Sequence, residues 1–406
     1  MATKPIPIYS QKETFYVPRF EVYVGEQKLK ANIINDILQV TYKDSINDID
    51  SFTIEINNWD ADKRQFKFAP PQKDFAGIFD PGKKIEIKMG YYQNIRRMMR
   101  GVITGLEPNF PGSGASTLSI HGLNELHKYR TEKHTFSWND AGKTDTEIAE
   151  DLCKRPVKKG QPGLGLEIDP HPADGEKPNE LVFMKSQHDI VFLLELARRN
   201  GYEIYLEDET DKPTLFFGVT DDSKEAPVYQ LEWGKSLISF RPVLTTAKQV
   251  GEVVVTWWDR KANKAVEEHY KLENLWKDEN RSKSEIALLS QIAKGYDNRT
   301  EIVTDEPMHT KKEAQKRAQS ILRDKNNRMI VASGSTVGLP DLRSGCTIEI
   351  LGLGVTDPGV DPHAACTDFN GQYFVEESTH IIGSGGYRTD FSARWKRKAT
   401  KPQGQS

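Results

Sequence analysis

The sequence predicts an α+β fold that is mainly β, on three observations. The N-terminal third alternates polar and apolar residues with a period of two, which is typical of antiparallel strands with one face on a core. The middle of the chain carries helix patterns and a hairpin pattern. Strand patterns return afterwards and alternate with further helix patterns up to the C-terminal end.

The N-terminal third is predicted to be a meander of short strands. Period-two alternation is clear in residues 51–56, 84–89 and 117–121. Residues 101–105 are predicted to form a short strand that bends or bulges at its terminal glycines, and 111–114 reads as a turn. Short strands at this spacing favour a small barrel or sandwich. We expect no helix before residue 140.

A first helix is predicted where Thr144 and Glu147 have the spacing of a capping box. In such a box the threonine hydroxyl and the glutamate carboxylate each bond a free amide of the first turn. The apolar stripe of this helix is Ile148, Ala149, Leu152 and Cys153. The following residues 156–180, rich in proline, glycine and lysine, are predicted to be loop.

A second helix is predicted over 186–200, with Gly201 where a left-handed C-cap belongs. A hairpin should follow, with strands at 202–206 and 214–217 around a charged turn. The two helices and the hairpin together indicate a small α/β insertion after the first strand region.

The last part of the chain repeats the scheme of strands, insertion and strands. A strand is predicted at 253–258, and capping boxes at Ser282 and Thr310 predict two helices, the second with Ala314, Ala318, Ile321 and Leu322 on one face. Further strands are predicted at 346–350, 372–375 and 389–392. The same order of predicted elements therefore occurs twice. No literal sequence repeat is visible, so an internal duplication is only a hypothesis.

The segment 339–345 is predicted to be a tight turn into the strand after it. Pro340 cannot donate to a strand ladder, and Gly345 can supply a positive φ. Ile348 and Ile350 should then share a buried face, with Thr347 and Glu349 on the other.

Composition limits the possible functions. The 406 residues, 46.1 kDa in mass, contain 56 Lys and Arg against 59 Asp and Glu, a net charge of -3. This balance argues against nucleic-acid recognition through bulk charge. The 37% of hydrophobic residues is enough for folded cores. The sequence contains no run of 18 apolar residues, so no integral membrane segment is predicted.

The cysteines and the catalytic motifs point to no reaction. Cys153, Cys346 and Cys366 have spacings that fit neither a disulfide framework nor a metal pair, which favours synthesis in a reducing compartment. No nucleophile elbow, phosphate-binding loop or dinucleotide fingerprint is present. The Gly/Ser segments 333–336 and 383–386 are predicted to be turns. We expect no catalytic residues, no enzyme activity and no cofactor.

Metal ligands are also not expected. The nearest candidates are His121 with His127 and His363 with Cys366, but neither pair has the spacing of a metal site on a helix or hairpin. Ordinary surface histidines are the simpler interpretation. His188 is interpreted as a group at a helix N-terminus rather than a catalytic base.

Two other features keep alternatives open. One of the adjacent Trp257 and Trp258 should face a core, whereas exposure of the pair would favour carbohydrate binding. The basic cluster 394–398 is interpreted as a solvated tail, with a docking contact to an acidic neighbour as the alternative.

Several segments resemble the phage late control gene D family, the baseplate hub proteins of contractile tails, which are related to the hub portion of type VI secretion spike (VgrG) proteins. They occur in the family's order: Gly101–Pro111 with Thr117–His127, Ser186–Gly201, Val253–Asp259, Thr336–Gly345, and Gly371–Val375 with Gly386–Phe391. Trp257 stands where the family usually has glycine. The resemblance covers roughly residues 17–395.

The resemblance implies two small antiparallel β-barrels in tandem, each with an α/β or helical insertion, in a hub-like trimeric ring. The expected divisions are 1–127 (first barrel), 128–226 (α/β insertion), 227–270 and 330–395 (second barrel), 271–329 (helical insertion) and 396–406 (basic tail).

It also implies a function. The chain is expected to be a structural hub that adapts a six-fold tail tube to a three-fold spike, as a homotrimer. The expected partners are the inner tube protein, a separate spike protein and other baseplate proteins. It should be made in the bacterial cytoplasm and assembled into a phage tail or injection particle. The alternatives are a cell-wall-degrading enzyme or a carbohydrate-binding module carried at the tail tip.

Overall fold

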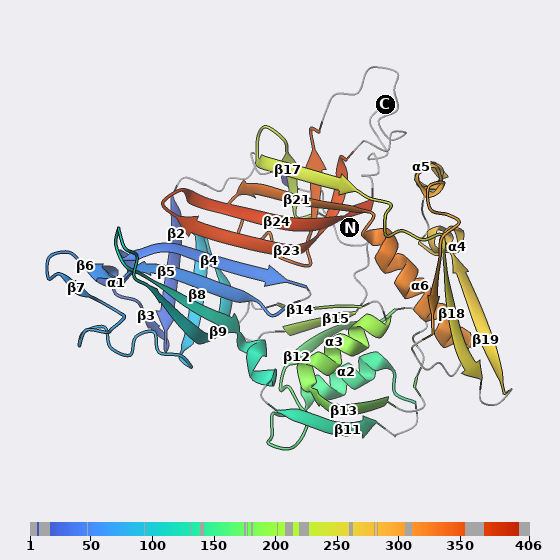
Figure 1. Ribbon diagram of the computed structural model, residues 1–406, viewed down its shortest axis with the longest axis horizontal. Helices are drawn as coiled ribbons and strands as arrows, with labels where there is room; N and C mark the ends of the chain where they lie inside the picture. The colour runs from blue at the N-terminus through green and yellow to red at the C-terminus, as the bar shows by residue number, and fades with distance from the viewer. Residues whose placement is uncertain are drawn as a thin grey trace.

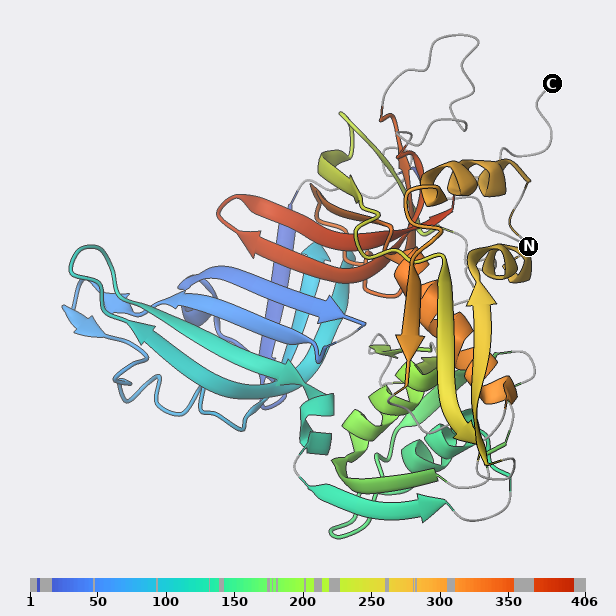
Figure 2. The same ribbon diagram turned by 45° about the vertical axis from the view of Figure 1, so that its right-hand side comes forward.

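The computed structural model is mainly β, with antiparallel sheets as its largest feature (Figures 1 and 2). It describes residues 6–7, 17–46, 48–92, 94–130, 132–138, 142–173, 176, 178–179, 182–200, 202–207, 214–218, 227–259, 263–279, 281, 283–304, 311–353 and 369–397. None of the helices in these ranges is long and apolar enough to cross a membrane.

The N-terminal unit consists of six strands. They are β2 (Pro18–Val24), β4 (Ile37–Ser45), β5 (Ser51–Asn57), β8 (Lys84–Tyr91), β9 (Asn94–Asn109) and β10 (Thr117–Asn124). Their spatial order is β2-β8-β9-β10-β5-β4. The predicted alternation is confirmed in β5, where Phe52, Ile54 and Ile56 are buried and the residues between them are partly exposed. Small strands lie beside this unit: β3 (Gln27–Lys28), β6 (Trp59–Asp60) and β7 (Gln65–Phe66).

Two expectations for this region need correction. A single helical turn, α1 (Ala31–Ile34), and a 3-10 helix, η2 (Glu125–Arg130), both precede residue 140. Both are too short to show a helical period in the sequence. The segment 101–105 is part of the long strand β9, and its bulge lies at Thr104, beside Gly105 rather than at a glycine, where the register shifts between His121 and Gly122.

The α/β insertion contains two helices and two small sheets. The helices are α2 (Asp145–Lys154) and α3 (Asp189–Asn200); the sheets are β11 (Lys133–Trp138) with β13 (Val182–His188), and β12 (Glu167–His171) with β15 (Thr214–Gly218) and β14 (Glu203–Glu207). The capping box is confirmed, since the Glu147 amide donates to Thr144 Oγ1 at 3.1 Å and the Thr144 amide to Glu147 Oε2 at 2.8 Å. The hairpin is confirmed as β14 and β15.

The sequence misplaced two boundaries in this insertion. Residues 186–188 belong to β13, where Gln187 and His188 pair with β11, and the helix begins only at Asp189. Strand β12 lies within the segment expected to be loop, because it pairs with β15 from far along the chain. The proposed C-cap at Gly201 lies outside the described residues.

The C-terminal unit also consists of six strands. They are β16 (Tyr229–Glu232), β17 (Leu237–Leu244), β21 (Ile330–Val337), β22 (Thr347–Leu351), β23 (Gly371–Gly383) and β24 (Gly386–Arg397). Strand β1 (Ile6–Pro7) pairs with β16. Between β17 and β21 the chain forms β18 (Glu252–Asp259), β19 (Lys264–Lys271), α4 (Leu272–Asp278), α5 (Lys283–Ala293), β20 (Thr300–Val303) and α6 (Lys311–Asn327). The expected face of α6 is confirmed, with Ala314, Ala318 and Leu322 buried. The caps expected at Ser282 and Thr310 lie outside the described residues.

The two units share one strand plan. The C-terminal order is β16-β22-β23-β24-β21-β17. When each unit's strands are numbered along the chain, both orders read first, fourth, fifth, sixth, third, second. The last five strands of this path are antiparallel in both units. Only the first strand differs, because β2 is antiparallel to β8 whereas β16 is parallel to β22.

The units are joined into one sheet by antiparallel pairing of β4 with β23. Reading downward in Figure 1, β17, β21, β24, β23 and β4 follow one another, and β5 pairs with β4 on its other side. The strand pairing of the described residues closes neither unit into a barrel. Three apolar cores form, one in each unit and one in the α/β insertion, and the N-terminal core includes Ile382 and Tyr387 from the β23–β24 hairpin.

Further expectations for the C-terminal unit have clear outcomes. Ile348 and Ile350 are buried and Gly345 has φ +87°, as predicted. The opposite face of β22 is not exposed, since Thr347 and Glu349 are also buried. Residues 333–336 are strand rather than turn, because β21 pairs with β17 and β24 on its two sides. The 383–386 turn is confirmed between β23 and β24.

The basic cluster near the C-terminus is not a solvated tail over its first part. Arg394 lies in β24 and forms ion pairs with Glu203 and Glu376, the first joining the sheet to the α/β insertion. Lys396 is also buried, and its Nζ lies 3.0 Å from Thr347 Oγ1. Arg394 therefore contacts acidic neighbours within this chain.

Candidate functional site

The polar side chains that the fold brings together lie at the junction between β4 and β23. Asp44 on β4 is buried, and its Oδ2 accepts from Arg343 Nε at 2.6 Å and from the Ser344 amide at 3.2 Å. Its Oδ1 accepts from the Ser378 hydroxyl. Arg343 also donates to Tyr42 Oη and to the Met98 carbonyl. Burial opposes the Arg343 cation, but Tyr42 and Asp44 hold its pKa above the ordinary value.

A histidine continues this network. Ser378 Oγ lies 3.0 Å from His380 Nε2, and His380 Nδ1 lies 2.9 Å from Tyr387 Oη and 3.1 Å from Thr389 Oγ1. Burial lowers the pKa of His380 to about 3, so the imidazole is neutral at physiological pH.

Serine, histidine and aspartate are the groups of nucleophilic hydrolysis, but here they are sealed. Ser378 and His380 are both 0% exposed. A substrate therefore has no access to the Ser378 hydroxyl in this fold. The network instead satisfies buried polar groups where the two units meet. Sequence reasoning missed it because its members come from β4, the loop before β22, and the β23–β24 hairpin.

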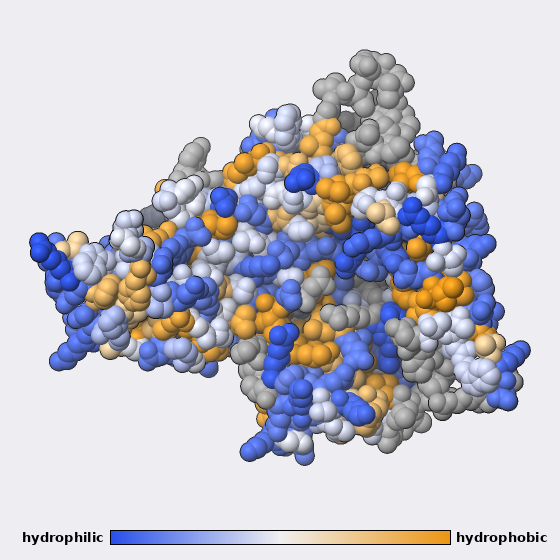
Figure 3. Space-filling model, viewed as in Figure 1, coloured by the Kyte–Doolittle hydropathy of each residue, from blue (hydrophilic) through white to orange (hydrophobic). Residues whose placement is uncertain are grey.

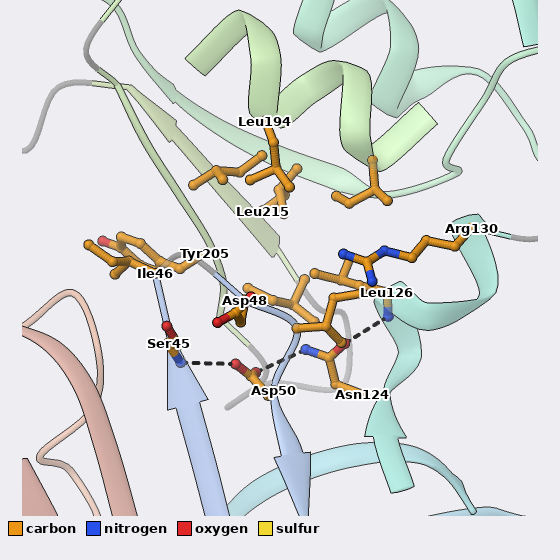
Figure 4. A pocket seen from close by; sticks show the side chains of 14 residues that line it. Ser45, Ile46, Asp48, Asp50, Asn124, Leu126, Arg130, Leu194, Tyr205 and Leu215 are labelled. Atoms are coloured by element: carbon orange, nitrogen blue, oxygen red, sulfur yellow. Dashed lines mark hydrogen bonds between the residues drawn. The ribbon is translucent and has the colours of Figure 1, made fainter. Parts of the chain in front are cut away.

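A small cavity lies beside the junction, between the N-terminal unit and the α/β insertion (Figure 4). Its volume of about 30 Å³ has room for only a few water molecules, and it is far below the roughly 300–1,000 Å³ of a typical pocket for an organic ligand. Polar groups line it from the β4–β5 connection and β10, and apolar groups from α3, β14 and β15 (Figure 4).

Asp50 lines the cavity and has a raised pKa. Its Oδ2 accepts from Asn124 Nδ2 at 2.9 Å and its Oδ1 from the Ser45 amide at 3.4 Å (Figure 4). Burial and the charge of Asp44 raise the pKa of Asp50 to about 7, against the opposing charge of Arg343. The carboxyl is thus placed to change charge near neutral pH at the contact between unit and insertion.

Of the residues singled out as metal candidates, only the side chain of His121 lies in the described part of the chain. His121 Nδ1 lies 3.1 Å from Thr53 Oγ1, and its Nε2 lies 3.3 Å from Glu107 Oε2. The side chain of His127, and His363 with Cys366, lie outside what the structure describes. His188 Nδ1 lies 3.0 Å from the carbonyl of Glu132. Within the described residues, no three His, Cys, Asp or Glu side chains are grouped to hold a metal ion.

Exposed apolar side chains mark the remaining candidate surfaces. Trp257 is buried, as expected for one of the pair, and Trp258 is 57% exposed. A second group lies in and just before β17, where Trp233, Ile238 and Val243 are exposed. Figure 3 shows apolar surface over the upper part of the molecule, where Figure 1 places β17. Strand edges with such residues are common sites of protein association.

A family model described as the Alg8 N-terminal domain matches residues 16–383, which is most of the chain. The chain belongs to the Alg8 N-terminal domain family. No curated protein matches it.

The fold of this family member is found in solved tail proteins. The 43 kDa tail protein of prophage MuSo2 from Shewanella oneidensis is 15% identical, with a TM-score of 0.63 over 93% of this chain and 98% of that one. The tail protein of Neisseria meningitidis MC58 is also 15% identical, with a TM-score of 0.62 over 94% and 98%. The E. coli c3393 protein, a component of the type VI secretion system, is 11% identical, with a TM-score of 0.53 over 94% and 79%.

Proposed function

We propose that this member of the Alg8 N-terminal domain family is a structural hub in the baseplate of a phage tail or contractile injection system. The observation that carries the proposal is the likeness of its whole fold to tail proteins, over 93% and 94% of the chain in two cases. The sequence resemblance to the late control gene D family supports the same role.

The repeated strand plan supports a role as symmetry adaptor. A homotrimer whose chains each carry two similar units presents six units to a six-fold inner tube. The same trimer presents three-fold symmetry to a spike. In this proposal the two units take the places of the two tandem barrels. The divisions are as expected, except that β18 and β19 are assigned to the insertion of the second unit. The chain assembles with tube, spike and other baseplate proteins. It is made in the bacterial cytoplasm and incorporated into the particle.

Non-enzymatic function is part of the proposal. The hydrolase-like group of Asp44, Ser378 and His380 has no exposure through its serine or histidine. Peptidoglycan turnover by the purified protein that is lost on one carboxylate or serine substitution would overturn this part and support the cell-wall enzyme.

Carbohydrate binding is the second candidate, favoured by one observation. Trp258 is 57% exposed on β18, and an exposed indole can stack on a sugar ring. A glycan-array signal that disappears in Trp258→Ala, but persists in the control Ile302→Ala on the neighbouring strand β20, would support this candidate.

The mass of the assembled protein tests the hub directly. Native mass spectrometry of the full chain with its tube and spike partners should show a species of about three times 46.1 kDa for this component. A monomer in the intact particle would contradict the symmetry argument.

A further inference from the structure

The two units correspond residue by residue along their fifth strands, β9 and β23. The Ile103 amide donates to the Lys83 carbonyl at 2.9 Å, and the Val375 amide donates to the Cys346 carbonyl at 2.9 Å. Each strand then shifts register by one residue directly after this point. Ile103 of β9 therefore corresponds to Val375 of β23, and Gly105 corresponds to Glu377.

The second strands, β4 and β17, correspond in the same way. Their ladders with β5 and β21 shift register after the first residue, skipping Leu38 in one and Ile238 in the other. Both skipped side chains are exposed, by 46% and 62%. The residues 39–45 of β4 therefore correspond to 239–245.

Within one chain, the second strand of one unit pairs with the fifth strand of the other. Residues 39–45 of β4 run antiparallel to 377–383 of β23, and Lys43 forms an ion pair with Glu377 at 2.9 Å across this junction. The counterparts of these two strands are β17 and the outer part of β9, residues 105–109. In the described part of the chain, β17 does not pair with β9.

Both counterparts have an open edge in the described part of the chain. From Ser239 onward strand β17 pairs only with β21, and residues 105–109 of β9 pair only with β10. Apolar side chains are exposed on both: Ile238 and Val243 along β17, and Leu106 and Phe110 along and just after β9. Each edge thus carries apolar surface next to unpaired strand backbone.

We propose that β17 of one copy packs antiparallel against residues 105–110 of β9 in a second copy of this chain, repeating the β4–β23 junction between subunits. The inference rests on the proposed assembly and names the surfaces that would form it. The corresponding register places Val243 opposite Glu107 and Arg241 opposite Asn109. Arg241 then lies diagonally across from Glu107, in the same sense as Lys43 from Glu377, so the charges are complementary.

The same register predicts a specific difference from the internal junction. Pro242 and Pro108 correspond to Tyr42 and His380, which face each other across β4 and β23. Neither proline has an amide to donate, so the hydrogen-bond ladder between copies is interrupted there. Contact between subunits would depend more on the apolar side chains and the Arg241–Glu107 pair. Proline on an open edge also discourages pairing with unrelated strands.

The geometry of this contact is head to tail. Each copy supplies one β17 and one β9, so every copy can bind one neighbour on each side. All of these edges are paired only when the copies close into a ring. Three copies would then alternate internal and intersubunit junctions around six units.

Disulfide trapping in the full-length chain tests the pairing. Directly opposite residues in antiparallel strands have Cα atoms about 4.5–5.5 Å apart, within the range a disulfide spans. Val243→Cys with Glu107→Cys should give covalently linked trimers on oxidation of the assembled protein, reversed by reductant. The matched control is Ser239→Cys with Glu107→Cys, because the register moves Ser239 four residues away, about 13 Å along the strand.

A charge exchange provides an independent measurement. Arg241→Glu should weaken trimer formation by about tenfold or more, and adding Glu107→Arg should restore it. A trimer that forms without selective cross-linking, or that is indifferent to both charges, would overturn this pairing while leaving the hub intact. Absence of any trimer in the particle would instead overturn the proposed hub, and this inference with it.

Discussion

Gly82 and Gly345 occupy the same position in the two units. The Gly82 amide donates to the Ile103 carbonyl at 2.7 Å, and the Gly345 amide donates to the Val375 carbonyl at 2.8 Å. Their φ angles are +90° and +87°. Each glycine directly precedes the fourth strand of its unit, β8 or β22, and bonds there to the fifth strand, β9 or β23. The backbone conformation at the start of the fourth strand is thus the same in both units, although the surrounding side chains differ.

Alanine at these two glycines should have unequal effects. Both substitutions force an L-residue into a left-handed conformation, at a cost of about 1–2 kcal/mol. A Cβ at Gly82 meets nothing within 4 Å, whereas one at Gly345 comes within 2.9 Å of the Tyr205 ring. Urea unfolding should therefore show Gly345→Ala to be more destabilising than Gly82→Ala. The double variant Gly345→Ala, Tyr205→Leu should recover the difference; equal losses for the two single variants would contradict the explanation.

The repeat was only partly predictable, because it lies in backbone plan rather than side-chain identity. Tyr42 corresponds to Pro242, and a sequence comparison cannot match these residues. Single strands such as β5 were predictable, since one face is apolar and the other polar. The burial of Thr347 and Glu349 on the second face of β22 could not be predicted, because their partners Lys396 and Gln230 come from distant strands. The polar junction around Asp44 could not be predicted, as no local spacing links it to Arg343.

Ile350 is expected to be essential for soluble folding. Its side chain is 0% exposed in the C-terminal core, so Ile350→Asp buries an unpaired carboxylate in apolar surroundings. Soluble yield and cooperative unfolding should both be lost. The milder control Ile350→Val should fold and cost about 0.5–1.5 kcal/mol. A soluble Ile350→Asp variant with a native-like unfolding transition would contradict the burial of this strand.

Substitutions at Glu349 should be tolerated better than Ile350→Asp. Its Oε2 accepts from Gln230 Nε2 at 2.7 Å, and its side chain is buried between strands β16 and β22. Glu349→Gln keeps the shape and an acceptor oxygen, so the chain should fold with a loss of about 1–2 kcal/mol. Glu349→Leu should then cost more, because it leaves the Gln230 amide without this acceptor. Thermal unfolding of the two variants measures the order, and the reverse order would exclude this hydrogen bond as the cause.

The Asp44–Arg343 pair should couple the two units strongly. Removing one partner leaves the other buried without its counter-charge, which typically costs 3–5 kcal/mol. Arg343→Met should therefore be severely destabilising. Adding Asp44→Asn should recover part of the loss, since the uncompensated carboxylate is gone. A double-mutant cycle on urea unfolding measures the coupling, and additive losses would show that the two side chains stabilise the fold independently.

Asp50 should make stability depend on pH between about 4 and 7. Its pKa is about 7 in the folded chain, against about 3.9 for an unperturbed aspartate. The folded state therefore holds the proton more tightly than the unfolded state across this range. Its contribution to stability is fully present below pH 4 and is lost as the pH rises through 7.

Asp50→Asn should remove this contribution and its slope. The free energy of unfolding of the wild type, minus that of Asp50→Asn, should fall as the pH rises from 4 to 7 and then level off. His380, whose folded pKa is about 3, acts in the opposite direction between pH 6.5 and 3, but it is present in both proteins and cancels in the difference. Asp48→Asn, an exposed site in the same β4–β5 connection, is the matched control. A difference curve for Asp50→Asn that is flat, or that rises over this interval, would show that Asp50 is already charged at the contact between the N-terminal unit and the α/β insertion.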